Sequence, residues 1–293
     1  MTKQRGTFAY PGGKTLIRRW IIDNFPEHKQ YVEVFGGAAS VLVGKDRSES
    51  EVYNDINSDC IKFFEAVKHH GEELAEWMEA TPYSRELFER WTNEYPNWPD
   101  DVVEHAGRFA FVQNANFGGK LLGESSATYK VNKADNTRLD KGGSKVWAGK
   151  PNDIEWLTER FKRVNIEHLD FEELMKKYDR PGAFYYCDPP YVDVGGGYYN
   201  TQDSENNNEF DHGRFVDTLL GLENAEWVVS YDHNIPDPLD EYHTIARTKT
   251  ATMSDQLPEK TETLTMSFDP NTTTLFSNTG QSDLEAYADG GEP

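Results

Sequence analysis

One stretch of the sequence, FYYCDPPYV at residues 184–192, combines residue types that could do chemistry. The aromatic residues before the acid favour a buried strand. Asp188 ends the strand, because Pro189 and Pro190 lack N–H donors and fix φ and so cannot extend a central strand. A carboxylate, a rigid carbonyl and the ring of Tyr191 are therefore expected together at a strand end. Such a set offers two hydrogen-bond acceptors and one flat surface.

A glycine-rich turn and a later acid suggest a binding site for a nucleoside. In a doubly wound sheet, the turn after the first strand approaches the ligand, and an acid about 20 residues later holds a ribose. Here the strand YVEVF (31–35) runs into the turn, and the strand EVYND (51–55) ends at Asp55. The spacing fits an adenosine ligand, whereas the nicotinamide fingerprint G-x-G-x-x-G is absent. A structural turn remains the alternative. The turn comprises Phe35, Gly36, Gly37 and Ala38.

The segment AYPGGKTLI precedes the first strand and contains a third candidate motif. Adjacent Gly12 and Gly13 allow a ligand to approach the backbone closely, and Lys14 supplies a point charge for a carboxylate. Tyr10 opens the motif. It is not a P-loop, because the leading strand and the G-x-x-x-x-G-K-[ST] spacing are missing. A tight turn before a helix TLIRRWI is the alternative.

The elements that must position these motifs alternate between strand and helix patterns. We expect strands at YVEVF and EVYND, with a helix-compatible stretch AASVLVGK after the first, and alternation again from RVNIEHLDF through ETLTMSF. This order predicts an α/β fold, a Rossmann-like doubly wound sheet. Residues 57–150 lack strand alternation and are rich in tryptophan, tyrosine and polar residues. We interpret them as an inserted, mainly helical domain between two parts of a catalytic domain, residues 1–56 and 151–279.

Composition limits the class of protein. The chain has 293 residues, 37% of them hydrophobic, and its amino terminus lacks the apolar core of a secretory signal. No apolar run approaches the roughly 20 residues that span a bilayer. We therefore expect a cytoplasmic protein that makes no membrane contact, with two free buried thiols, Cys60 and Cys187. The histidines lack paired ligand spacing, so no metal site is expected.

The net charge of −21 argues against a nucleic-acid partner only if the charge is spread evenly. Residues 117–150 carry seven basic and three acidic residues and so run against the rest of the chain. This segment is a candidate DNA-contacting patch. A solvated loop is the alternative. The residues expected to contact phosphates or base edges are Lys120, Lys130, Lys133 and Arg138.

The motif order YPGGK, VEVFGGAAS, NDIN, an insert and then YCDPPY resembles that of the DNA adenine methyltransferases of the Dam type. The resemblance covers most of the chain, from Tyr10 to about Phe268. It implies that residues 57–150 are the target-recognition insert, in which RFAFVQNANFGGK leads to a DNA-binding hairpin. After Asn116-Phe117-Gly118 this chain has Gly119-Lys120, where many relatives have a hydrophobic residue and a later arginine.

The resemblance implies S-adenosylmethionine as cofactor, held by residues of four motifs. Glu33 and the Asp170-Phe171 pair are second-rank candidates, the pair near the adenine ring. Glu33 as a strand-surface acid, Asp170 as a helix N-cap and Tyr10 as a core aromatic remain alternatives. The implied first-rank residues are Tyr10, Gly12, Gly13, Lys14, Phe35, Gly36, Gly37, Ala38, Asp55 and Asp188.

The chemistry implied is site-specific methylation of the N6 amino group of adenine in duplex DNA. An exocyclic amine is a poor nucleophile, so Asp188 and the Pro189 carbonyl would accept hydrogen bonds from its N–H groups and align the nitrogen with the methyl group. Pro190 would add rigidity to that carbonyl. A base flipped out of the duplex would stack on Tyr191. We therefore assign catalysis to the DPPY residues.

Two other activities remain open. An N4-cytosine methyltransferase uses the same kind of pocket, although an aspartate at position 188 favours adenine. A relative that binds DNA but has lost catalysis is the second, and the intact motifs argue against it. Cytosine-C5 methylation is disfavoured because Cys187 lies on the strand itself and lacks a preceding proline. A cognate restriction endonuclease stays open as a partner, and the sequence does not define the oligomeric state.

Two polar segments have no assigned chemistry. The linker at residues 195–213 follows DPPY and is long and poor in apolar residues, so we favour a mobile lid over passive disorder. The final residues, 280–293, are acidic and are expected to be disordered.

Overall fold

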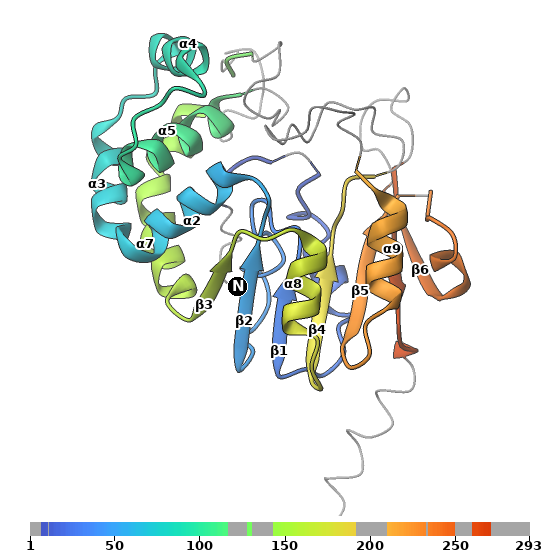
Figure 1. Cartoon of the computed structure of the whole chain (residues 1–293). Helices are drawn as coiled ribbons and strands as arrows, with labels where there is room; N and C mark the ends of the chain where they lie inside the picture. The colour runs from blue at the N-terminus through green and yellow to red at the C-terminus, as the bar shows by residue number, and fades with distance from the viewer. Residues whose placement is uncertain are drawn as a thin grey trace, which may run out of the picture.

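A computed structural model describes residues 7–10, 12–116, 128–130, 143–191, 210–232, 234–249 and 260–270. Within them, the centre of the molecule is a seven-stranded sheet in the order β3-β2-β1-β4-β5-β7-β6 (Figure 1). The strands are β1 (Gln30–Glu33), β2 (Ser50–Asn54), β3 (Val164–Glu167), β4 (Ala183–Cys187), β5 (Glu226–Tyr231), β6 (His243–Lys249) and β7 (Lys260–Met266).

The strand order places a topological switch point beside the DPPY motif. Strands β1 to β5 pair in parallel, and only β7 runs antiparallel, to both β5 and β6. The chain moves outward from β1 through β2 to β3, and then returns to β4 on the other side of β1. Ligands bind at such a point, outside the carboxyl ends of the strands. Asp188 follows β4 at this point.

Alternation along the central strands divides the core into two layers. Tyr31, Phe184 and Tyr186 belong to one buried cluster, whereas Val32 and Tyr185, their neighbours along the strands, belong to the other. Because successive strand side chains point to opposite faces, one sheet supports helices on both sides. Helices α8 (Phe171–Tyr178) and α9 (His212–Leu220) cover one face (Figure 1).

The remaining long helices gather beyond the β3 edge of the sheet (Figure 1). Helix α7 packs against α3 and α2, and α5 packs against α2, α3 and α4. The hydrophobic core of this group is continuous with one layer of the sheet core. The division into residues 57–150 and a catalytic remainder stays a prediction. The long helices are α2 (Ser58–His69), α3 (Gly71–Ala80), α4 (Arg85–Glu94), α5 (Val102–Ala115) and α7 (Lys150–Phe161), and the short α6 (Gly143–Ala148) packs against α5 and α7.

One expected helix is absent. The stretch AASVLVGK forms a series of turns, because Ala39 takes a positive φ of 52° and the N–H of Leu42 donates to the carboxylate of Glu33. A non-glycine residue with such a φ interrupts regular helix. The expected helix TLIRRWI is also shorter, with α1 confined to Arg18–Ile22.

Other expectations can be compared with the described residues. Cys60 and Cys187 are free and buried, as predicted. In these residues no helix is long and apolar enough to cross a membrane, and no group of three or more metal-ligating side chains occurs. Several predictions lie outside the described residues: the tail, most of the linker, and the assignments of Lys120, Lys133 and Arg138.

Candidate active site

A hollow of about 300 Å³ lies at the carboxyl ends of β1, β2 and β4. Its lining combines all the candidate cofactor residues with Pro190 of the DPPY motif. Pro189 is buried, and Tyr191 is half-buried beside Asp188. The candidate cofactor residues in the lining are Tyr10, Gly12, Gly13, Lys14, Glu33, Phe35, Gly36, Gly37, Ala38, Asp55, Asp170, Phe171 and Asp188.

The glycine turn is built around two tyrosine rings and one acid. A Cβ on Gly36 would lie 2.1 Å from the Tyr53 ring, so only glycine fits there. The Gly37 N–H donates to Oδ2 of Asp55 at 2.6 Å, and the Asn57 N–H donates to Oδ1 at 2.8 Å. Burial raises the pKa of Asp55, and these backbone donors oppose the rise. The turn and the acid predicted from spacing therefore form one hydrogen-bonded unit.

Asp188 is paired with the lysine of the first motif. The Nζ of Lys14 lies 2.8 Å from Oδ2 of Asp188 and donates to the Gly12 carbonyl at 2.9 Å. Burial raises the pKa of Asp188, the charge and hydrogen bond of Lys14 lower it, and Glu262 raises it, with a net rise. The carboxylate is thus a desolvated acceptor whose charge is balanced locally.

Tyr191 is fixed by an acid from another strand. Its hydroxyl donates to Oε2 of Glu262 in β7 at 2.7 Å and lies 3.4 Å from Oδ1 of Asp188. The Nζ of Lys14 lies 5.0 Å from the centre of the ring, within cation–π range. A hydrogen bond to another strand therefore holds the ring beside Asp188.

Glu33 is a pocket residue rather than a surface acid. It is 2% exposed, and its Oε2 accepts hydrogen bonds from the Tyr31 hydroxyl at 2.8 Å and the Leu42 N–H at 2.7 Å. Burial raises the pKa of Glu33 to about 8, although both hydrogen bonds oppose the rise.

The opposite wall of the pocket is aromatic. The Phe35 ring lies 6.0 Å from that of Phe171 and 5.5 Å from that of Phe210, centre to centre. Asp170, which lines the pocket, is also the N-cap of α8: it accepts the Glu172 N–H at 3.0 Å. Its N-cap role was the alternative considered from sequence. The wall offers flat apolar faces of the kind that a purine ring packs against.

Several lining residues were missed by sequence reasoning. Asn54 accepts the Leu169 N–H at 2.9 Å and donates to the Val34 carbonyl at 2.9 Å, which ties the strand ends together. Its place in NDIN was a usable signal. Phe210 follows a polar linker and lines the pocket. Glu262 lies outside the lining, in β7, and reaches the site through its contact with Tyr191. Neither position has a local signal in the sequence, since the fold brings each of them to the site.

A second hollow, of about 320 Å³, adjoins the first on the side of α5. Its lining includes Lys130, Asn116 and the hydroxyl pair of Thr15 and Ser40, whose oxygens lie 3.2 Å apart. Tyr10 lines both hollows. Of the predicted DNA contacts, Lys130 is the one in the described residues, and it lines this second hollow. Its role in DNA binding stays a prediction.

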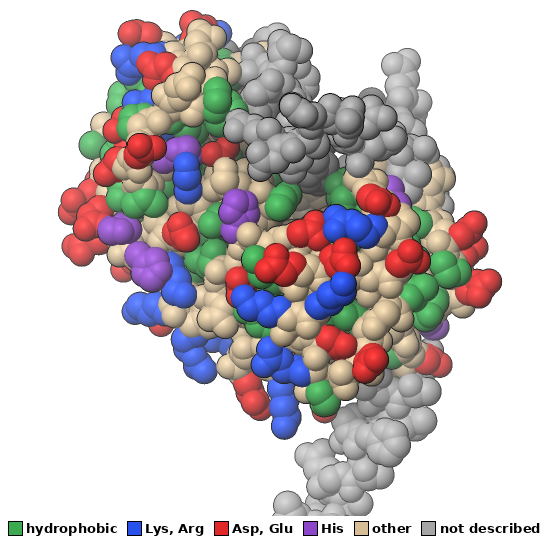
Figure 2. Space-filling model, in the orientation of Figure 1, with side chains coloured by type: hydrophobic (Ala, Val, Ile, Leu, Met, Phe, Trp, Pro, Cys, Tyr) green, Lys and Arg blue, Asp and Glu red, His purple; other side chains and the backbone are tan. Residues whose placement is uncertain are grey.

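The side of the molecule that carries α8 and α9 is not uniformly acidic (Figure 2), although the net charge of the chain is −21. Figure 2 shows acidic and basic side chains interspersed over the side that carries α8 and α9. On this side Arg214 forms ion pairs with Asp170 at 2.8 Å and Glu172 at 3.1 Å. Local pairing of this kind reduces the effect of the total charge on an approaching polyanion.

Comparisons with known proteins agree with one another. The sequence model of a family described as D12 class N6 adenine-specific DNA methyltransferase matches residues 10–263. A DNA adenine methylase of Vibrio cholerae is 25% identical over 196 residues, which is 66% of this chain and 67% of that protein. A DNA N-6-adenine-methyltransferase of Escherichia phage P1 is 23% identical over 64% of this chain but 24% of its own length.

Structural comparison adds little to this. A solved chain described as a conserved hypothetical protein from Streptococcus pyogenes aligns with 86% of this chain and 94% of its own length, at 8% identity and a TM-score of 0.34. A similarity this low supports no statement about function.

Proposed function

Because the chain belongs to the D12 class N6 adenine-specific DNA methyltransferase family, we propose that its pocket binds S-adenosylmethionine and presents it to an adenine flipped out of duplex DNA. The family establishes the reaction class, methylation of adenine in DNA. The proposal adds the identity of the methyl donor and the residues that hold the two substrates. The observation that carries it is the single lining shared by the glycine turn, Asp55, Glu33, Lys14 and Asp188.

The side chains present fit that donor. A nucleoside needs an acceptor for its ribose hydroxyls, and Asp55 lies at the end of β2 beside the turn. A purine needs flat apolar faces, which Phe35 and Phe171 offer. The positively charged groups of the donor need negative charge nearby, which an ionised Glu33 would supply, with the Lys14-paired Asp188 in the same lining. When bound, S-adenosylmethionine would supply an electrophilic methyl group.

The DPPY residues would prepare the amine for attack. Asp188 and the Pro189 carbonyl would each accept a hydrogen bond from one N–H of the exocyclic amine, which directs the nitrogen lone pair out of conjugation with the ring. Two prolines keep that carbonyl from reorganising. Hydrogen-bonding groups fixed in this way typically contribute about 10² to 10³ in rate each.

Tyr191 would stack on the flipped base. Its hydroxyl is held by Glu262, so the ring would not need to be ordered when the base arrives. Stacking of this type contributes about 1 to 3 kcal/mol per base.

Contacts to the duplex would come from the segment that begins after α5. Lys130 lies half-buried at the second hollow, where its N–H donates to the Ala115 carbonyl at 2.7 Å. Lys120, Lys133 and Arg138 would extend the same basic segment. A cognate restriction endonuclease as a partner remains a prediction to be tested separately.

Methylation of plasmid DNA tests the proposal. Purified protein, plasmid and S-adenosylmethionine are incubated over a range of salt concentrations, and the digested nucleosides are separated by mass spectrometry. We expect N6-methyladenine, confined to one sequence context when the product is sequenced by a single-molecule method. N4-methylcytosine alone would contradict the adenine assignment. No methylated base at any salt, with cofactor binding intact, would favour the non-catalytic alternative.

A further inference from the structure

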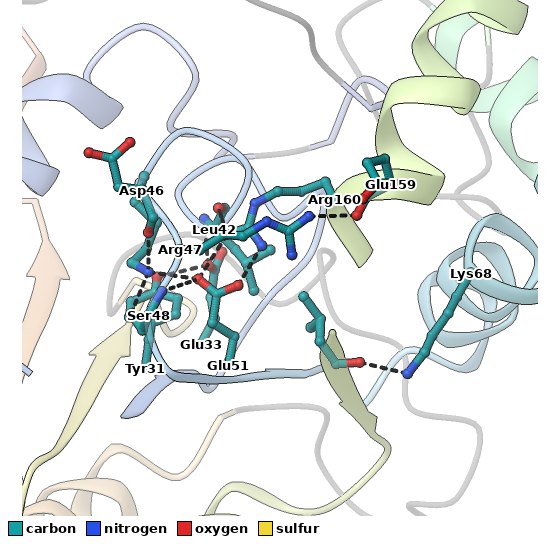
Figure 3. Close-up of polar contacts among 12 residues, drawn as sticks. Tyr31, Glu33, Leu42, Asp46, Arg47, Ser48, Glu51, Lys68, Glu159 and Arg160 are labelled. Carbon is teal, nitrogen blue, oxygen red and sulfur yellow. Dashed lines mark hydrogen bonds and ion pairs between the residues drawn. The ribbon is translucent and has the colours of Figure 1, made fainter. Parts of the chain in front are cut away.

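The carboxylate of Glu33 lies at the inner end of a chain of buried polar contacts (Figure 3). Its Oε2 accepts from two groups, the Tyr31 hydroxyl and the Leu42 N–H. Both hydrogen bonds reach the same oxygen. Since Glu33 also lines the cofactor pocket, this arrangement fixes the orientation of its carboxylate there.

Each of these two donor residues is itself held by a buried cation. The carbonyl of Leu42 accepts from Arg160 at 2.7 Å, and the Nζ of Lys45 lies 4.5 Å from the centre of the Tyr31 ring. Leu42 therefore connects Arg160 to Glu33 through its backbone, with its carbonyl on Arg160 and its N–H on Glu33. Tyr31 connects Lys45 to Glu33 through one side chain.

The two cations meet on one acid. Glu51 in β2 accepts from Lys45 at 2.8 Å and from both terminal nitrogens of Arg160, one of them at 2.9 Å. The side chains of Lys45, Glu51 and Arg160 are 4%, 3% and 6% exposed. We refer to Lys45, Glu51 and Arg160 as the buried ion cluster.

The charges of the buried ion cluster do not balance by themselves. Two cations surround one carboxylate, and buried charges are costly unless they are compensated. Lys45 lowers the pKa of Glu33 against the larger effect of burial. An ionised Glu33 would bring the four groups to neutrality. Arg160 belongs to α7, which packs on the helices beyond β3.

We propose that the buried ion cluster is a positioning device, through which Arg160 of α7 and Lys45 hold the Glu33 carboxylate toward the positive charge of the methyl donor. The inference rests on the proposed function, since it needs a cationic ligand in the pocket. It assigns a role in cofactor binding to Lys45, Glu51 and Arg160, none of which lines the pocket among the described residues.

The arrangement predicts a pH dependence of cofactor binding. The pKa of Glu33 is raised to about 8, so below that pH most of its carboxyl is protonated. A cationic ligand favours the ionised form, and its binding below pH 8 therefore releases the proton of Glu33. Affinity then rises with pH and levels off above about pH 8, with a limiting slope of about tenfold per pH unit. Five charged or titratable side chains on the neighbouring elements interact electrostatically with Glu33: Tyr31, Lys45, Tyr53, Tyr186 and Asp188.

A double-mutant cycle on the full chain tests the positioning role. The dissociation constant for S-adenosylmethionine is measured by calorimetry at pH 6 to 9 for the unaltered protein, Arg160→Lys, Glu33→Gln and the double variant. Arg160→Lys keeps the charge but loses the forked contact with Glu51 and Leu42. We expect it to weaken binding at pH 8.5 by about fivefold or more, and to have no effect in the Glu33→Gln background.

Two further variants complete the design. Arg47→Lys is the matched control, because the exposed Arg47 also contacts α7, by donating to the Glu159 carbonyl at 2.5 Å, but has no contact with the ion cluster. We expect its affinity to be unchanged. Tyr31→Phe leaves the cluster intact and removes one hydrogen bond that lowers the pKa of Glu33. The pH midpoint of binding should therefore move upward, whether or not Arg160→Lys folds.

The outcomes separate the inference from the proposed function. An equal loss of affinity on Arg160→Lys in both backgrounds would contradict the positioning role, as would an unshifted midpoint in Tyr31→Phe. If the unaltered chain fails to bind S-adenosylmethionine at every pH, the proposed function fails and the inference with it.

Discussion

The ammonium group of Lys14 lies 2.8 Å from the Oδ2 atom of Asp188. The two residues are far apart in the sequence, and one belongs to the first motif and the other to DPPY. Without Lys14, Asp188 would be a partly buried carboxylate whose pKa is raised by desolvation and by the charge of Glu262. Lys14 therefore favours the ionised form of Asp188, which can accept a hydrogen bond from an amine.

Replacing Lys14 by methionine should narrow the active pH range from the acid side. Lys14 lowers the pKa of Asp188, so removing Lys14 raises that pKa. When the pH is lowered, Asp188 in the variant therefore becomes protonated at a higher pH than in the unaltered enzyme. We expect the acid limb of the kcat/KM profile to move upward by about one pH unit or more. Lys162→Met, which removes an exposed lysine of the α7 C-terminus, is the control. Identical acid limbs in Lys14→Met and the unaltered enzyme would contradict this role.

Substitutions of Tyr191 should separate stacking from hydrogen bonding. Tyr191→Phe keeps the ring and loses the contact with Glu262, whereas Tyr191→Ala loses both. We expect Tyr191→Ala to weaken flipping of a target base by about 1 to 3 kcal/mol, and Tyr191→Phe to retain most of it. Fluorescence of 2-aminopurine placed at the target position measures the flipping. Equal losses in the two variants would argue against a stacking role.

The pocket could be predicted well because its motifs follow strand ends. In a parallel sheet the carboxyl ends of adjacent strands lie together, so the residues after β1, β2 and β4 must meet. Lys14 lies in a turn outside the sheet. Its place in the same pocket was predicted from the family resemblance and not from the spacing of the motifs.

Gly36→Ala should destabilise the protein by a steric effect. A Cβ at this position would lie 2.1 Å from the ring of Tyr53, which is fully buried and whose hydroxyl donates to the Gly37 carbonyl. We expect a cost of about 1 to 3 kcal/mol in the free energy of unfolding, together with weaker cofactor binding. Gly149→Ala is the control, because its nearest contact would be 3.5 Å. Chemical denaturation measures the free energy of unfolding of both variants, and equal values for the two would contradict the steric explanation.

Lys130→Gln tests the one predicted DNA contact that lies in the described residues. If Lys130 contacts a phosphate, its loss should reduce the slope of log K against log salt by about 0.9, with similar weakening for all sequences. Fluorescence anisotropy with a labelled duplex measures the slope. Lys176→Gln, which removes an exposed lysine of α8, should leave it unchanged. An unchanged slope for Lys130→Gln would show that this lysine does not contact DNA.

Other features needed the fold. AASVLVGK has a helical composition, yet Glu33 takes the N–H of Leu42 and Ala39 adopts a left-handed backbone. The hydrogen bond links Leu42 to Glu33 of β1, and the helix propensity of AASVLVGK gives no indication of it. The contact of Glu262 with Tyr191 joins β7 to the end of β4. Its residues are 71 positions apart, so only the tertiary structure reveals it.

The most direct measurement is the yield of N6-methyladenine from Asp188→Asn. This variant keeps the shape of the side chain and loses the negative charge and one acceptor. Asp217→Asn, an exposed acid on α9, is the matched control. The proposed mechanism predicts a rate at least about 100-fold lower for Asp188→Asn, with unfolding temperature preserved and Asp217→Asn fully active. Methylation by Asp188→Asn within a few-fold of the unaltered rate would contradict it.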